Sequence, residues 1–297
     1  MGQRIIVPQY KMPNLRYVTS TELPMVKRQL ENSNQNLEWF FSNGITPGKD
    51  LAYEIVRENL VQLHLNNYMG TGLMITSDGW IITAAHTIRN ELEEIHKLTE
   101  SRKLAFASLR GNELSKLADK YFIQLKENDN KKHKKYVLDI QYYAIDPSHD
   151  LVLLKADVND NGAPSVITLD IYNQKIHRGD FVKAFGFSNY EFMRSIGRVR
   201  QSKINIQINP DVSVYDLFNF DVYIEPGASG GPVLINDRLA GIICSSKYVP
   251  GAKHEIGHGK AVKIKHAQNL VNGYISYIRN NLRNEKMNVP LVIYSKI

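Results

Sequence analysis

Short apolar runs separated by turn residues constrain the fold of this chain more than any other feature. Val61, Leu63 and Leu65 alternate with polar residues, which is the period of two that a half-buried strand requires. The tripeptide at 77–79 then separates two further runs as a hairpin turn would. Strands are expected at 61–65, 69–75, 80–83, 121–125, 136–143 and 151–154, and again at 181–185, 197–208, 220–224, 232–234, 240–243 and 261–264. Two groups of short strands favour an all-β chain of paired barrels or sandwiches.

Helical periodicity is confined to the two ends of the chain and to one internal segment. Thr21 is placed to cap a helix in the first 50 residues, and a second short helix is expected around 51–60. Apolar residues recur at helical spacing in 89–118, which predicts a helical insertion. They do so again at 270–282, which predicts a C-terminal helix with one apolar face.

Charge and cysteine content limit the partners and the compartment. The formal net charge is +7, but the densest basic run, Lys131–Lys135, lies beside acidic and amide residues as an exposed hairpin tip does. We therefore expect no nucleic acid partner. The single cysteine, Cys244, allows no intrachain disulfide, and we see neither a secretory signal nor an apolar run that would cross a bilayer. The expected location is the cytoplasm, without membrane contact.

The segment Gly-Ala-Ser-Gly-Gly-Pro at 227–232 is the strongest sign of chemistry. A serine hydroxyl becomes an effective nucleophile only if a base takes its proton and donors stabilise the oxyanion that forms. Small residues around Ser229 allow a sharp turn, so that the N–H groups of Gly227 and Ser229 can point at one spot. Ser229 is the candidate nucleophile, and the oxyanion hole is expected from Gly227 and Ser229.

The base and its orienting carboxylate must come from elsewhere in the sequence. His86 follows Thr83-Ala84-Ala85 at the end of an apolar strand, where small residues leave room for an imidazole ring. Asp150 is the polar residue at the mouth of the apolar run 151–154. A carboxylate in that position can hold the imidazole tautomer and stabilise imidazolium.

Together these three segments resemble trypsin-like (chymotrypsin-fold) serine proteases, most closely the bacterial HtrA/Deg type. The resemblance covers about residues 55–285 and rests on the stretches 70–86, 150–154, 178–187 and 221–232. Their order of His, Asp and Ser is the order of that family, whereas unrelated triad folds run differently. The resemblance implies two six-stranded chymotrypsin-like β-barrels with His86, Asp150 and Ser229 as the catalytic triad.

On this reading the chain divides into four units with some departures from the family. The units are a helical N-terminal extension (1–50), a first β-barrel with the helical insertion (51–165), a second β-barrel (166–265) and a C-terminal helix and tail (266–297). Ala228 stands where secreted zymogens have an aspartate, so activation by a newly cut N-terminus is not expected. No PDZ domain is expected after the last helix. The extension and the insertion are the expected regulatory segments.

The resemblance also places the substrate pocket. Tyr223, Ile224, Ser245 and Ser246 are expected to line it. No aspartate falls where a trypsin-like pocket would hold one, so a small or apolar substrate side chain is expected. Glu225 is a nearby charge that could alter this preference.

The sequence also contains the motif of a different protease class. His254-Glu255-Ile256-Gly257-His258 satisfies the zinc pattern H-E-x-x-H, which needs a helix so that both histidines meet one metal. Glycines in and after the motif oppose a helix, and the run at 261–264 that follows indicates a strand. We expect a loop of the second barrel here, with no metal and no cofactor.

The sequence leaves two functions open. One is a serine endopeptidase that cleaves protein substrates through an acyl-enzyme and that an activating or regulatory protein partner gates. The other is a catalytically silent binding module of the same fold that acts through its N-terminal extension and insertion. All three triad positions are intact, which favours the endopeptidase.

Overall fold

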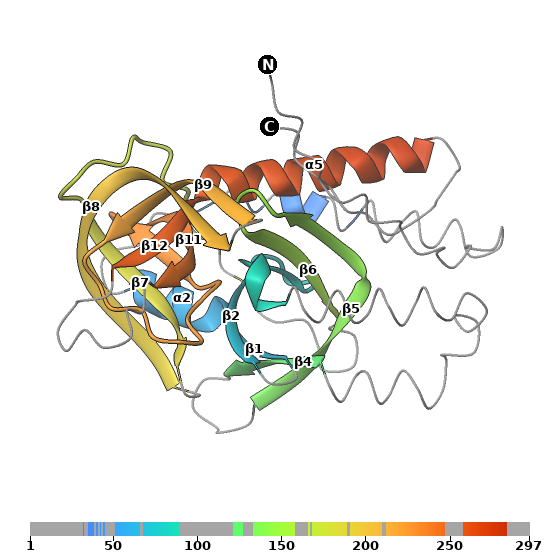
Figure 1. Cartoon of the computed structure of the whole chain (residues 1–297). Helices are drawn as coiled ribbons and strands as arrows, with labels where there is room; N and C mark the ends of the chain where they lie inside the picture. Colours follow the sequence, from blue (N-terminus) through green and yellow to red (C-terminus); the bar gives the residue numbers. More distant parts are fainter. Residues whose placement is uncertain are drawn as a thin grey trace, which may run out of the picture.

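Twelve strands form two closed barrels in the part of the chain that the structure describes (Figure 1). This computed structural model describes residues 32, 35–38, 40, 42, 44, 51–65, 68–88, 121–126, 133–157, 166, 168–188, 191–209, 212–246 and 258–283. The two six-stranded barrels expected from the sequence are confirmed. The segment expected as a helical insertion (89–118) lies outside the described residues.

The first barrel is an antiparallel sheet in the order β1-β2-β3-β6-β5-β4, closed by pairing of β4 with β1. Its strands are β1 (Leu60–Leu65), β2 (Tyr68–Met74), β3 (Trp80–Ala84), β4 (Tyr121–Lys126), β5 (His133–Asp146) and β6 (Leu151–Asp157). All five side chains of β3 are buried. Trp80 and Ile82 face the same apolar cluster as the C-terminal helix, so this strand is covered on its outer side as well.

The second barrel follows the order β10-β11-β12-β9-β8-β7, closed by pairing of β7 with β10. Its strands are β7 (Phe181–Ser188), β8 (Glu191–Asn209), β9 (Val212–Phe220), β10 (Pro232–Ile235), β11 (Arg238–Ser246) and β12 (Gly259–Lys263). The long β8 alternates buried or half-buried residues with exposed ones along part of its length, as a strand with one wet face does.

The strand expected at 220–224 is wrong. Strand β9 ends at Phe220, and residues 221–225 form a loop. Val222 and Ile224 are buried while Tyr223 is exposed, so this loop imitates the period of two of a strand. The true strand lacks that period, because Asp216 has a φ of 54° and the residues after it, Leu217 and Phe218, are both buried.

Helix α5 (Ile264–Arg283) runs along one side of the two barrels, whereas α2 (Leu51–Asn59) lies away from it (Figure 1). Helix α5 begins directly after β12 and packs on strands of both barrels, and α2 leads into β1, as expected. The described residues between 32 and 42 are helical, and Leu37 and Phe40 among them are buried in the main apolar cluster. The boundaries of the four units stay predictions. No helix in the described part of the chain combines the length and apolar character that a bilayer span needs.

Candidate active site

Three turns bring the predicted catalytic residues to the junction of the two barrels. His86 lies in the short turn η1 (Ala85–Thr87) after β3, Asp150 lies in the turn between β5 and β6, and Ser229 lies in the turn before β10. Two contacts cross the junction here. The Thr71 N–H of β2 donates to the Ser229 carbonyl at 2.9 Å, and the Cys244 thiol of β11 lies 3.1 Å from Asp150 Oδ2.

Two hydrogen bonds join His86 to Asp150. His86 Nδ1 lies 2.6 Å from Asp150 Oδ2, and the His86 backbone N–H donates to Oδ1 at 2.8 Å. Asp150 is fully buried, whereas about a third of the His86 side chain (32%) is exposed. A carboxylate at Nδ1 keeps the proton on that nitrogen, so Nε2 is left as the proton acceptor on the accessible side of the ring.

Cys244 belongs to this site, although the sequence analysis gave it no part in the chemistry. The residue is buried, and its thiol hydrogen-bonds the same carboxylate oxygen that holds His86 Nδ1. A register shift between Ile243 and Ser245 places Cys244 in an irregular part of β11. A single buried cysteine carries no sequence signal that distinguishes such a contact from packing, because the contact depends on the neighbouring barrel.

His86, Asp150 and Cys244 are also the one group of candidate metal ligands found among the described residues. Their geometry is that of a hydrogen-bonded set. A tetrahedral zinc ion with bonds of about 2.0–2.3 Å holds its ligand atoms roughly 3.3–3.8 Å apart. His86 Nδ1 and Asp150 Oδ2 are only 2.6 Å apart, which fits a shared proton and leaves too little room for a common ion.

Glycines allow the serine turn to pack closely against the first barrel. Gly227 and Gly230 have φ angles of 96° and 89°, which favour glycine. A Cβ atom on Gly230 would lie 2.0 Å from both Thr71 O and Thr83 Oγ1. This close approach sets Ser229 beside β3, the strand that leads to His86.

The hydroxyl of Ser229 makes no hydrogen bond to any residue that the structure describes, so the Ser229–His86 contact is not formed here. Nucleophile–base contacts are commonly long in the free enzyme and shorten in the substrate complex. Ala228, just before the candidate nucleophile, is buried in the core of the second barrel. A Cβ atom added to Gly186 would lie 2.6 Å from the Cβ of Ala228. Its surroundings are therefore apolar and tightly packed, unlike those of a charged activation residue.

The turn that carries Asp150 is docked on the second barrel. The Tyr215 N–H of β9 donates to the Ser148 carbonyl at 3.1 Å. The ring of His149 stacks on that of His266 in α5, with 3.7 Å between centroids and 16° between planes. His149 thus has a specific contact that nothing in the sequence alone indicates.

Asp216 lies beside this stack, where its carboxylate is 3.0 Å from His266 Nε2. Burial raises the pKa of Asp216, but hydrogen bonds from two lysines and from His266 outweigh it and hold the pKa well below its ordinary value. The lysines, Lys263 and Lys265, each lie 2.5 Å from the carboxylate. Burial lowers the pKa of His266, the hydrogen bond to Asp216 opposes this, and the charge of nearby His149 adds to the lowering.

The predicted pocket residues lie in two segments of the second barrel, the loop after β9 and the end of β11. Tyr223 is half-exposed (51%) and Ile224 is buried (1%) in the loop after β9. Ser245 and Ser246 end β11 and pair with Lys260 and Gly259 of β12, while their side chains lie outside the described part. A Cβ on Gly259 would lie 2.7 Å from Ile224, so the segments are in direct contact. Glu225 is half-buried, and its carbonyl accepts the Ala228 N–H.

Most of the H-E-x-x-H motif lies outside the described residues. Only His258 is described, and it is exposed directly before β12. The expected strand at 261–264 is found at Gly259–Lys263, with α5 beginning at Ile264. The absence of metal at this motif therefore stays a prediction.

Comparisons with known proteins match this chain to peptidases. Residues 70–242 match the sequence model of a trypsin-like peptidase domain. A Corynebacterium glutamicum (strain R) protein, described as an uncharacterized peptidase, is 25% identical over 217 residues. The match covers 66% of this chain and 65% of that relative, so just under two thirds of the relative's length is represented.

Solved structures show the same fold. The crystal structure of Deg5 matches with a TM-score of 0.53 and 19% identity, covering 77% of this chain and 94% of that one. The protease domain of MamO from Magnetospirillum magneticum matches with a TM-score of 0.51 and 18% identity, covering 73% of this chain and 97% of that one. The resemblance to Deg-type proteases seen in the sequence is therefore confirmed at the level of fold.

Proposed function

Because the chain belongs to the family of trypsin-like peptidase domains, we propose that it is a serine endopeptidase with His86, Asp150 and Ser229 as its catalytic triad. The observation that carries the proposal is the hydrogen bond of 2.6 Å between His86 Nδ1 and the buried Asp150. A carboxylate removed from water and aimed at one imidazole nitrogen leaves the other nitrogen as a base.

The chemistry follows from that arrangement. His86 Nε2 takes the Ser229 proton as Ser229 Oγ attacks the peptide carbonyl, and the N–H groups of Gly227 and Ser229 bind the oxyanion. The imidazolium then gives its proton to the leaving amine, and an acyl-enzyme remains. Water attacks the ester with His86 again as base, and Ser229 regains its proton when the acid product leaves.

Access to this chemistry is proposed to be gated by a protein partner or signal. A protease in the expected cytoplasmic location would be hazardous if it were always active. Ala228 offers no charge for the zymogen mechanism of secreted relatives, and the Ser229–His86 contact still has to form. The substrate is proposed to be a protein whose side chain at the cleavage site is small or apolar.

A fluorophosphonate probe tests the nucleophile. The protein is tested with and without cell lysate: wild type should be labelled in at least one of the two conditions, and Ser229→Ala in neither. Ser77→Ala is the matched control, because Ser77 is exposed in the β2–β3 turn and should label as wild type does. Labelling only in lysate would support gating, whereas complete cleavage of unfolded casein by the purified protein alone would rule gating out.

Two further outcomes point away from the proposal. If no condition gives Ser229-dependent labelling, the silent binding module becomes the better account. If a chelator abolishes proteolysis that persists in Ser229→Ala, the zinc motif at 254–258 becomes the candidate centre.

A further inference from the structure

Thr71 in β2 joins the first barrel to the serine turn through both its backbone and its side chain. It is fully buried. Its N–H donates to the Ser229 carbonyl at 2.9 Å, and its hydroxyl donates to the Gly227 carbonyl at 2.7 Å. Two anchored carbonyls therefore bracket the short stretch of chain that contains the Ser229 N–H.

The hydroxyl of Thr71 is also fixed from the other side. It accepts the Phe187 N–H of β7 at 2.8 Å. A hydroxyl has one proton to donate, and the acceptor role toward Phe187 leaves that proton for Gly227. The Thr71 carbonyl in turn accepts the Thr83 hydroxyl at 2.6 Å, so the backbone of Thr71 cannot shift freely.

Gly227 is the part of the turn that most needs support. Its φ of 96° is open to glycine at little cost, and glycine also gives the backbone many other conformations. A Cβ at this position would lie 2.8 Å from the Phe187 carbonyl, so the turn rests directly on β7. The Thr71 hydroxyl on the Gly227 carbonyl therefore fixes one end of the Gly227–Ala228 peptide, and the bond of 3.2 Å from the Ala228 N–H to the Glu225 carbonyl fixes the other.

We propose that Thr71 is a positioning residue, whose hydroxyl holds the Gly227–Ser229 backbone in the orientation that forms the oxyanion hole. The inference rests on the proposed serine endopeptidase function. It adds that the hole is assembled across the barrel junction, because its donors belong to the second barrel and the group that orients them belongs to the first.

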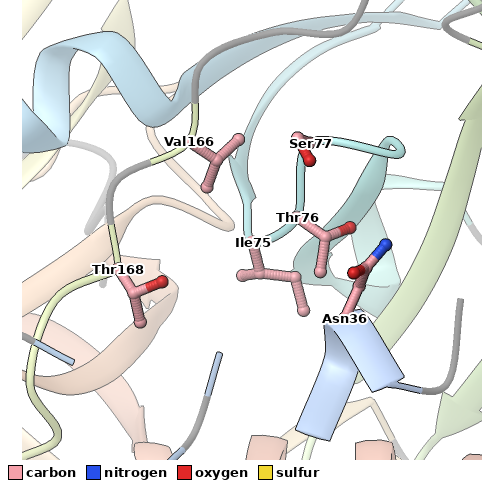
Figure 2. A pocket seen from close by; sticks show the side chains of 6 residues that line it. All are labelled: Asn36, Ile75, Thr76, Ser77, Val166 and Thr168. Atoms are coloured by element: carbon pink, nitrogen blue, oxygen red, sulfur yellow. The ribbon is translucent and has the colours of Figure 1, made fainter. Parts of the chain in front are cut away.

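The test compares Thr71→Val with Thr71→Ser and with a matched control in the full chain. Valine keeps the shape and removes the hydroxyl, whereas serine restores it. Thr76→Val is the control, because Thr76 is also buried and its hydroxyl also accepts a buried backbone N–H, that of Trp80 at 3.0 Å. Thr76 lies in the β2–β3 turn beside a crevice that Thr168 and Asn36 also line (Figure 2).

Two readouts are measured for each variant, under the condition in which wild type labels best. The first is the rate of fluorophosphonate labelling, together with kcat and KM for casein. Because a misplacement of about 1 Å can cost roughly 100-fold, we expect Thr71→Val to lose about 10- to 100-fold in labelling rate and kcat, with KM little changed. The second is hydrogen exchange of peptides covering 226–231, which should become faster in Thr71→Val alone.

The outcomes separate this inference from the proposed function. Wild-type labelling in Thr71→Val, or equal losses in Thr76→Val, would overturn the role of Thr71 while leaving the nucleophile intact. If wild type itself never labels, the proposed function fails, and the exchange measurement still decides: unchanged exchange at 226–231 in Thr71→Val overturns the inference. Recovery of both readouts in Thr71→Ser supports it.

Discussion

At the scale of single residues, the unusual group is the buried carboxylate of Asp150. Its φ of 53° lies in the left-handed region, which aspartate tolerates better than most residues. Its two oxygens meet the His86 ring, the His86 backbone and the Cys244 thiol. A buried charge is stable only with such partners, so the loss of any of them should be felt by the carboxylate and by the imidazole that it orients.

Replacement of Cys244 tests this dependence. Cys244→Val removes a donor to a buried charge and should lower kcat about 10-fold, because a hydrogen bond to a charged group contributes about 1.5 kcal/mol or more. Cys244→Ser supplies a stronger donor and should retain near wild-type activity. Casein cleavage by the two variants is the measurement, and equal activities would mean that Cys244 contributes only packing.

At the scale of elements, the stacked rings of His149 and His266 join the β5–β6 turn to α5. The pKa of His266 is lowered, so the folded protein disfavours its protonated form. The unfolded chain then binds more protons than the folded chain as the pH falls through the ordinary histidine value of about 6.5. The free energy of unfolding should therefore decrease as the pH falls through this range.

The replacement His266→Gln should flatten this dependence. Each proton taken up on unfolding contributes about 1.4 kcal/mol per pH unit to the slope of the unfolding free energy against pH. Between pH 7 and 5, the slope for His266→Gln should be smaller than that of wild type by up to this amount. Urea unfolding at several pH values measures it. Arg279→Ala, a change in an exposed side chain elsewhere on α5, should keep the wild-type slope. A wild-type slope in His266→Gln would assign the dependence to other groups.

At the scale of the whole molecule, the barrels and the helices share one apolar cluster. It includes Leu37 and Phe40 of the N-terminal segment, strand residues of both barrels, and Val271 and Tyr274 of α5. The rings of Trp80 and Tyr274 meet edge to face with 4.9 Å between centroids. The C-terminal helix is therefore part of the core on which β3, the strand before His86, is built.

Removal of the Tyr274 ring should weaken the whole fold. Tyr274→Ala leaves a cavity under β3 and should cost about 3–5 kcal/mol, the range for large aromatic residues in cores. Arg279→Ala removes an exposed ion pair with Glu38 and should change stability by less than about 1 kcal/mol. Denaturant unfolding of both variants checks this, and similar losses in the two would mean that α5 is held mainly by its surface.

Much of the fold and of the candidate site could be predicted because the signals are local. Alternation along 61–65, the hairpin turn at 77–79 and the glycines around Ser229 each depend on a few neighbouring residues. Prediction failed at 220–224, where buried Val222 and Ile224 imitate a strand in a loop, and at β9, where Asp216 interrupts the alternation. It also missed the polar contacts of Cys244 and Thr71, since nothing near either residue indicates them.

The sequence by itself therefore determined the two groups of short strands and the small residues that allow a sharp serine turn, because backbone preferences and side-chain periodicity act over a few residues. The resemblance to trypsin-like proteases implied that the strands close into two barrels and that His86, Asp150 and Ser229 form the candidate triad. Only the tertiary structure decided which groups orient the site: Thr71 on the Gly227 carbonyl, Cys244 on Asp150 and His266 on His149. Each of these pairs joins residues far apart in the chain, and only the packing of the two barrels and α5 brings them within contact.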